Sequence, residues 1–314
     1  MKQVTNIIKM VNPFNNREDV PVPVYILKKM LAFLFIYYVA GMIGGEVIII
    51  GGLSLMGYDP LHGVMPDTNT LMLIQYYGFI CFFISAIIYC KLVEKRTLKS
   101  LGFNKRILDY VSGAIIAVIL LVITMGICCL TGGISFIGIG KNVDYIYTLA
   151  LLAGLMIQGA AEEAMCRGFL MPSLSKKVST PVAVFLSATA FAYPHFFTLA
   201  DGEFKYVFMG LVNIYLISII FSLLMLARAN IWVSCGLHSI WNFLLYGVFG
   251  LALSGNEAGT SGIICFQANK ASLLNGGEYG IEASLIMTFI LIMAVFITYK
   301  YWKKQRKGEI KHGI

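Results

Sequence analysis

The chain has 314 residues, of which 58% are hydrophobic and only 13% are charged, and its mean hydropathy is +0.79. Soluble domains are about half apolar and about one-quarter charged, so this composition excludes a soluble globular enzyme and a disordered or fibrous chain. The net charge of +8 could indicate a nucleic-acid partner, unless the basic residues follow a membrane topology.

Eight hydrophobic runs follow one another along the chain, each of about the 20 residues that cross a bilayer as a helix. We therefore predict an all-α, polytopic membrane protein with about eight transmembrane helices. The predicted spans are Met30–Leu53, Leu71–Lys91, Leu108–Leu130, Tyr145–Leu170, Pro181–Leu199, Tyr206–Ala227, Ile231–Leu253 and Ala283–Trp302. Residues 1–29 then form a cytoplasmic segment, residues 30–302 a single transmembrane domain, and residues 303–314 a basic cytoplasmic tail.

The basic residues do follow such a topology, because Lys and Arg concentrate on the cytoplasmic side of membrane proteins. With the N-terminus in the cytoplasm, 20 of the 24 Lys and Arg residues fall in inside segments. Only Lys141, Lys205 and Lys270 fall in outside loops, and Arg167 lies within a span. The split predicts that both termini are cytoplasmic, and it accounts for the positive charge without a nucleic-acid partner.

Ionisable side chains deep in a span cost free energy and mark candidate functional sites. The first span holds Glu46, which could pair with Arg167, contribute to a pocket or face a cavity. The other candidates are Glu162, Glu163 and Arg167 in the fourth span, His195 in the fifth, and His238 with its neutral companion Asn242 in the seventh.

The charges of the fourth span have different surroundings on the helix. Glu163 and Arg167 are four residues apart, so they stack on one face and can neutralise each other as a structural brace. Glu162 points about 100° away and has no such partner, which suits a general base or acid. The alternative is a buried ionic cluster that only holds helices together.

The two histidines lie at a depth comparable with that of Glu162. At 1.5 Å per residue, Glu162, His195 and His238 lie roughly 11–21 Å above the cytoplasmic side, so they can meet within the hydrocarbon. His195 follows Pro194, which bends its helix. His238 and Asn242 share a helix face by their spacing. Packed histidines that bridge helices are the alternative interpretation.

Two hydrolytic mechanisms and one transport function suit these residues. Glu162, oriented with His195, could take a proton from water while His238 and Asn242 donate hydrogen bonds to an oxyanion. Alternatively, Glu162, His195 and His238 could hold a zinc ion with water as the fourth ligand. A proton-coupled transporter, with Glu46, Glu162 and the histidines as a relay, is the third.

Three motifs on separate predicted spans carry a resemblance to a known family. Glu162-Glu163-x-x-x-Arg167, Phe191-x-x-x-His195 and His238-x-x-x-Asn242 resemble, in order and spacing, the motifs of the CPBP family of CaaX proteases and bacteriocin-processing enzymes, also called Abi. The loop 95–103, which contains Arg96, is similar to the basic loop before the core in that family. The motif-bearing core covers about residues 108–249.

The resemblance implies an intramembrane endopeptidase of the glutamate type that does not require a metal, although zinc is possible. It implies that Glu162, His195, His238 and Asn242 are catalytic and that Glu163 and Arg167 support them. The expected partners are the lipid bilayer and a hydrophobic or membrane-anchored peptide, either CaaX-like or a leader peptide. We expect a multi-pass protein of a bacterial plasma membrane. A non-catalytic bacteriocin immunity or scaffold protein is the alternative.

Overall fold

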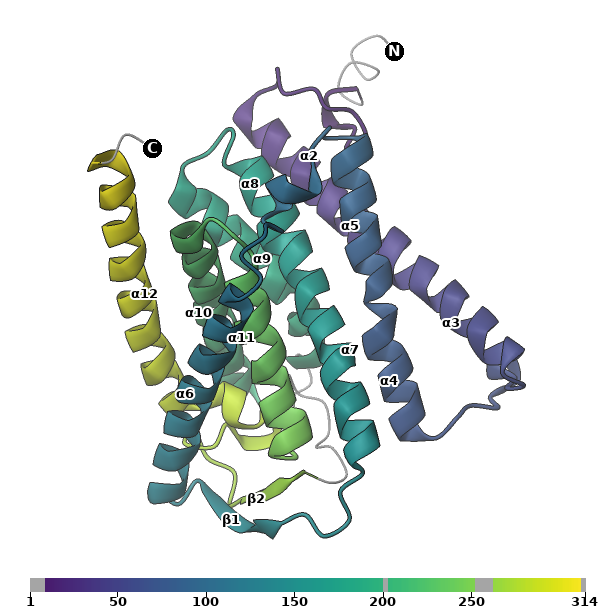
Figure 1. Cartoon of the computed structure of the whole chain (residues 1–314), viewed down its shortest axis with the longest axis vertical. Coiled ribbons are helices and arrows are strands. Elements are labelled where there is room, and N and C mark those ends of the chain that lie inside the picture. Colours follow the sequence, from purple (N-terminus) through teal and green to yellow (C-terminus); the bar gives the residue numbers. More distant parts are fainter. Residues whose placement is uncertain (1–8, 200–202, 252–261, 312–314) are drawn as a thin grey trace. The chain divides into compact units, whose positions relative to one another are not determined.

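A computed structural model describes residues 9–199, 203–251 and 262–311 and is mostly helical (Figure 1). Its contacts divide the chain into two compact units. Unit 1 contains residues 1–103 and 157–190, and unit 2 contains residues 104–156 and 191–314. Two of the three boundaries between the units fall within helices α7 (Tyr145–Glu163) and α9 (Thr180–Leu199), and the third falls between residues 103 and 104.

Unit 1 is built from long apolar helices. Its first membrane helix is continuous, and a π-helical stretch in its middle packs against α5. The fourth predicted span ends in the π-helix η4, and the short helix α8 follows it. The elements are α2 (Val22–Leu34), η1 (Phe35–Ile43), α3 (Gly44–Leu55), η2 (Pro60–His62), α4 (Thr68–Gly78), α5 (Ile80–Leu92), η3 (Leu98–Leu101), the end of α7, η4 (Ala164–Leu170), α8 (Met171–Leu174) and the start of α9.

Unit 2 contains two pairs of closely packed helices, α6 with α11 and α10 with α12, which run side by side in Figure 1. Its elements are α6 (Asp109–Leu130), β1 (Ile134–Ile139), the start of α7, the end of α9, α10 (Phe204–Arg228), α11 (Trp232–Asn242), η5 (Phe243–Val248), β2 (Ile264–Ala268), η6 (Gly277–Tyr279), η7 (Ile281–Ala283) and α12 (Leu285–Lys311).

A two-stranded sheet corrects the prediction of an all-α fold. Strands β1 and β2 pair antiparallel, with Ile134 opposite Ala268 and Ile139 opposite Ile264. A bulge after Phe136 is accommodated by Gly138, whose φ of 140° favours glycine. The sequence reading missed the sheet because its strands are short and lie in segments far apart in the chain.

Among the residues that the structure describes, six of the eight predicted spans form helices that are long and apolar enough to cross a membrane, judged by length and composition: Val22–Leu55, Thr68–Leu92, Asp109–Leu130, Tyr145–Leu174, Phe204–Arg228 and Leu285–Lys307. The other two, Pro181–Leu199 and Ile231–Leu253, contain α9 and α11, which are not among the six. The chain is therefore a mostly helical membrane protein, and six of its helices meet the criteria for a span.

The first of these helices begins earlier than predicted, directly after Pro21, and so includes Lys28 and Lys29. Both side chains are buried, with 0% and 1% exposure. The Lys28 amine donates to the Arg17 carbonyl at 2.8 Å, and the Lys29 amine pairs with the carboxylate of Glu94. These partners, from the segment before α2 and from the loop after α5, explain how two cations lie inside an apolar helical unit.

The close approach of α6 and α11 depends on two glycines that face each other's helix. A Cβ on Gly113 would lie 1.9 Å from the Val233 carbonyl oxygen, and one on Gly236 would lie 2.0 Å from the Tyr110 carbonyl oxygen. Because backbone atoms block both positions, any larger residue must push the helices apart. The packing matters for the site, since α11 carries His238 and Asn242.

We expect Gly113→Ala to lower the free energy of unfolding by about 1–3 kcal/mol, the usual cost of overpacking. The measurement is denaturant unfolding in detergent micelles. Gly126→Ala is the matched control on the same helix, because no atom lies within 4 Å of its added Cβ. Equal stabilities of the two variants would contradict the proposed role of the close contact.

Candidate active site

The fourth predicted span places an ion pair inside unit 1, where α7 passes into the π-helix η4. Arg167 Nη1 donates to Glu163 Oε1 at 2.9 Å, and both side chains have 0% exposure. The predicted pairing across one helical turn is therefore formed. Because the two formal charges cancel within the helix, the pair can remain buried where a single ion would be costly.

Glu162 lies next to this pair in sequence but has different contacts. Its side chain is partly buried, and Glu162 Oε1 accepts a hydrogen bond from Gln158 Nε2 at 3.2 Å. The prediction concerned a cationic partner of the kind that Glu163 has, and the contact seen here is of another kind. The partner is a neutral amide one turn earlier, which orients the carboxylate without adding a positive charge.

In unit 2, a backbone carbonyl orients His195, which lies partly buried on α9. His195 Nδ1 is 2.9 Å from the Phe191 carbonyl oxygen. A carbonyl can only accept, so in the neutral ring this contact places the proton on Nδ1. The other nitrogen, Nε2, then carries the lone pair and can accept a proton or bind a metal.

His238 on α11 is almost fully buried, with 4% exposure, and lies among aromatic rings. Its ring stacks on Phe221 with centroids 5.1 Å apart and meets Phe191 edge-on at 5.7 Å. Phe191 also contacts the His195 ring at 5.0 Å. One phenylalanine therefore touches both predicted catalytic histidines, which brings them into one cluster.

Asn242 lies one helical turn after His238 and is also buried, with 6% exposure. Helix α11 ends at Asn242 and continues as the π-helix η5, just as α7 ends at Glu163 and continues as η4. Inserted π-turns are frequent at functional sites, because the extra residue re-aims the side chains beside it. Nothing in the hydropathy pattern indicated either turn.

Glu46 lies exposed on α3 in unit 1, whereas Arg167 is fully buried. Among the described residues, Glu46 forms no ion pair with Arg167, so the first of its three predicted roles is wrong. Its exposed position separates it from the buried pair of the fourth span.

The candidate residues are thus grouped by unit: Glu162, Glu163 and Arg167 in unit 1, and His195, His238 and Asn242 in unit 2. Within either unit, the described residues include no three His, Cys, Asp or Glu side chains placed to hold one metal ion. The three ligands of the zinc alternative, Glu162, His195 and His238, come from both units.

Two further residues contact this candidate site. Gln158 precedes Glu162 by four residues, so helical spacing alone could have identified it. Phe221 comes from α10, and its apolar surroundings in sequence gave no signal that it would stack on a histidine.

Comparison with known protein families gives a match to part of the chain. Residues 144–244 match the family described as type II CAAX prenyl endopeptidase, Rce1-like. The match covers less than half of the chain but includes all the candidate residues except Glu46, and it confirms the resemblance to the CPBP family. No curated protein and no solved structure matches the chain.

The buried ion pair should be strongly coupled. We expect Arg167→Met or Glu163→Leu alone to lower the free energy of unfolding by about 3–5 kcal/mol, because each leaves an uncompensated buried charge. The double variant should lose clearly less than the sum of the two, as measured by denaturant unfolding in micelles. Additive losses would show that the two side chains do not depend on each other.

Proposed function

We propose that the chain is an intramembrane endopeptidase that hydrolyses a peptide bond with an activated water. The observation that carries the proposal is the contact of Phe191 with both histidine rings inside the segment that matches a protease family. Two histidines in one cluster, on the segment that also holds Glu162, form a set of groups able to move protons.

In the proposed first step, the Glu162 carboxylate takes a proton from water as the water oxygen bonds to the carbonyl carbon. The Gln158 amide orients this carboxylate. Glu163 is neutralised by Arg167, which leaves Glu162 as the carboxylate for proton transfer. His195 assists through Nε2, since its Nδ1 is directed to the Phe191 carbonyl.

His238 and Asn242 are proposed to stabilise the oxyanion that forms on the attacked carbonyl. Both can donate hydrogen bonds, both are buried, and they lie one turn apart on the same helix. Donors held in a water-poor setting need little reorganisation as charge develops. When the carbon–nitrogen bond breaks, the proton held by Glu162 passes to the leaving amine.

Zinc remains the alternative way to activate the water. A carboxylate and two imidazoles are suitable zinc ligands. A histidine whose Nδ1–H donates a hydrogen bond to a carbonyl presents its Nε2 to a metal, as many histidine ligands do. Glu162, His195 and His238 would hold the ion, which would lower the pKa of a bound water. The favoured mechanism needs no ion, because the same residues can move the proton themselves.

The substrate is proposed to be a hydrophobic or membrane-anchored peptide, CaaX-like or a leader peptide, because the candidate residues lie on apolar helices. We further propose eight spans with both termini in the cytoplasm of a bacterial plasma membrane. Helix α9 has 20 residues, about 30 Å in length, and α11 with η5 extends from Trp232 to Val248. These two helices would complete the eight.

We expect Glu162→Gln to slow hydrolysis by about 10²–10⁴-fold, the usual contribution of a general base, so that N-termini produced by the wild type are lost. The measurement compares the N-termini of membrane proteins in cells that express wild type or variant at equal levels. Glu46→Gln is the matched control, since Glu46 is an exposed glutamate in another helix. Identical termini in all three strains would refute the protease and favour an immunity or scaffold protein.

Chelation separates the two ways of activating water. In the favoured mechanism, the purified protein keeps its activity after treatment with a zinc chelator, because Glu162 takes the proton directly. Loss of cleavage on chelation, with recovery on added zinc, would instead support the metal-assisted mechanism. Cleavage of a fluorogenic peptide in micelles is the readout.

A further inference from the structure

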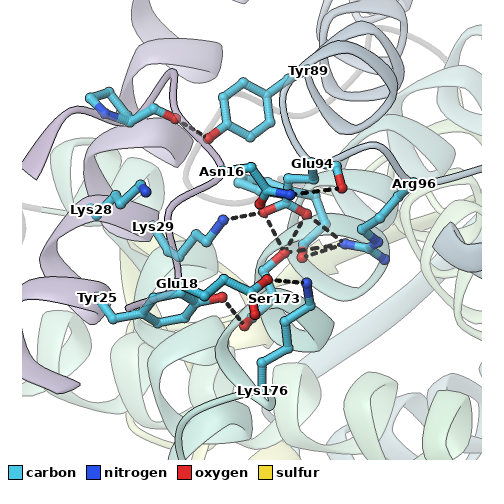
Figure 2. Close-up of polar contacts among 12 residues, drawn as sticks. Asn16, Glu18, Tyr25, Lys28, Lys29, Tyr89, Glu94, Arg96, Ser173 and Lys176 are labelled. Atoms are coloured by element: carbon cyan, nitrogen blue, oxygen red, sulfur yellow. Dashed lines mark hydrogen bonds and ion pairs between the residues drawn. The ribbon is translucent and has the colours of Figure 1, made fainter. Parts of the chain in front are cut away.

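The loop after α5 reaches the backbone of the segment that follows Glu162 and Glu163. Figure 2 shows Arg96 gathered with Glu94, Lys29 and Ser173 in unit 1. Arg96 Nη2 donates to the Gly168 carbonyl at 2.7 Å, and Arg96 Nη1 lies 3.3 Å from the Phe169 carbonyl oxygen. Arg96 therefore contacts the π-helix η4 directly after Arg167.

The Gly168 carbonyl needs an external donor because of the residue four positions later. In an α-helix that carbonyl would accept from the backbone N–H of residue 172, but residue 172 is proline and has none. The π-type bonding of η4 ends just before this point, with the Met171 N–H bonded to the Cys166 carbonyl, and α-type bonding resumes with the Ser175 N–H on the Met171 carbonyl. A carbonyl left without a partner in a buried helix is costly, and the Arg96 guanidinium supplies the bond.

From this geometry we propose that Arg96 is a positioning residue for the helix that carries Glu162. Its guanidinium group donates a hydrogen bond to the Gly168 carbonyl, for which Pro172 offers no N–H. In this way Arg96 holds η4, and with it the adjacent turn of α7, in one arrangement. The inference rests on the proposed function, because it gives Glu162 the general-base role.

Arg96 is itself held from several sides, as a positioning group must be. Its side chain is only 11% exposed, it pairs with Glu94 Oε2 at 3.1 Å, and it donates to the Ser100 carbonyl at 2.8 Å. The preceding residue, Lys95, has a φ of 56°, a left-handed backbone conformation that residues other than glycine seldom adopt. The loop accepts this conformation at the residue directly before Arg96.

Glu94 connects this contact to the first membrane helix. It pairs with Lys29 and accepts hydrogen bonds from the Ser173 hydroxyl at 2.7 and 2.9 Å. Burial alone would raise the pKa of Glu94, but Lys29, Ser173 and Arg96 outweigh it and hold the pKa below the usual range. The carboxylate is therefore charged at neutral pH and keeps the guanidinium in place.

Lysine cannot reproduce the contact. The planar guanidinium group reaches three carbonyls, two hydroxyls and a carboxylate with donors in a fixed fork, whereas an ammonium is a point charge with three donors. Arg96→Lys thus keeps the positive charge beside Glu94 but loses the hydrogen bonds to the Gly168 and Phe169 carbonyls. This allows the positioning role to be separated from simple charge balance.

The experiment measures kcat and KM for a membrane peptide with four purified proteins: wild type, Arg96→Lys, Pro172→Ala and the double variant. We expect Arg96→Lys to lower kcat by about 10–100-fold, in line with small displacements of reacting groups, and to change KM little. Pro172→Ala restores an N–H for the Gly168 carbonyl, so the double variant should recover most of the lost kcat.

Arg106→Lys is the matched control. Arg106 follows the same loop, is 54% exposed and also donates to a backbone carbonyl, that of Arg228, at 3.3 Å. It should leave kcat unchanged. Normal kcat in Arg96→Lys would overturn the inference, and so would a double variant no better than Arg96→Lys, because a purely ionic or structural brace gives no rescue by Pro172→Ala.

Amide hydrogen exchange separates this inference from the proposed function. In Arg96→Lys, exchange over residues 164–170 should speed up, and it should return to the wild-type rate in the double variant. If wild type and Glu162→Gln cleave nothing, the proposed function fails, while exchange still decides whether Arg96 holds η4. Unchanged exchange in Arg96→Lys would overturn the inference whatever the activity.

Discussion

The main physical constraint on this molecule is that each charge buried among its apolar helices needs a partner at hydrogen-bonding distance. Arg167 and Glu163 meet this constraint within one helical turn and have no exposed surface. Lys29, Glu94 and Arg96 meet it by joining three segments of unit 1. Because a single buried ion costs far more than a paired one, these contacts limit how the surrounding helices can pack.

The same requirement applies to the backbone, and it links the two proposals. Two of the three motif helices, α7 and α11, pass into π-helical turns directly after Glu163 and Asn242. Such turns re-aim side chains, but they also displace carbonyls from their normal donors. Pro172 has no backbone N–H to donate to the Gly168 carbonyl, and the side chain of Arg96 donates to that carbonyl instead. The irregular backbone beside the candidate site is thus stabilised by a residue outside the motifs.

Aromatic packing plays the corresponding role for the histidines of unit 2. Phe191 contacts the rings of His195 and His238, and its own carbonyl orients His195. One residue therefore sets both the position of the two rings and the tautomer of one of them. Aromatic contacts of this kind add no charge beside the two rings, which suits general acid–base chemistry.

The sequence by itself determined the membrane class, the helical character and the Glu163–Arg167 pair, because hydropathy and helical periodicity are local properties. The spacing of the motifs also indicated the family that residues 144–244 match. Only the tertiary structure decided that Lys29 is buried against Glu94, that Phe221 stacks on His238, and that a two-stranded sheet forms. These features join segments far apart in the chain, and no local pattern encodes such contacts.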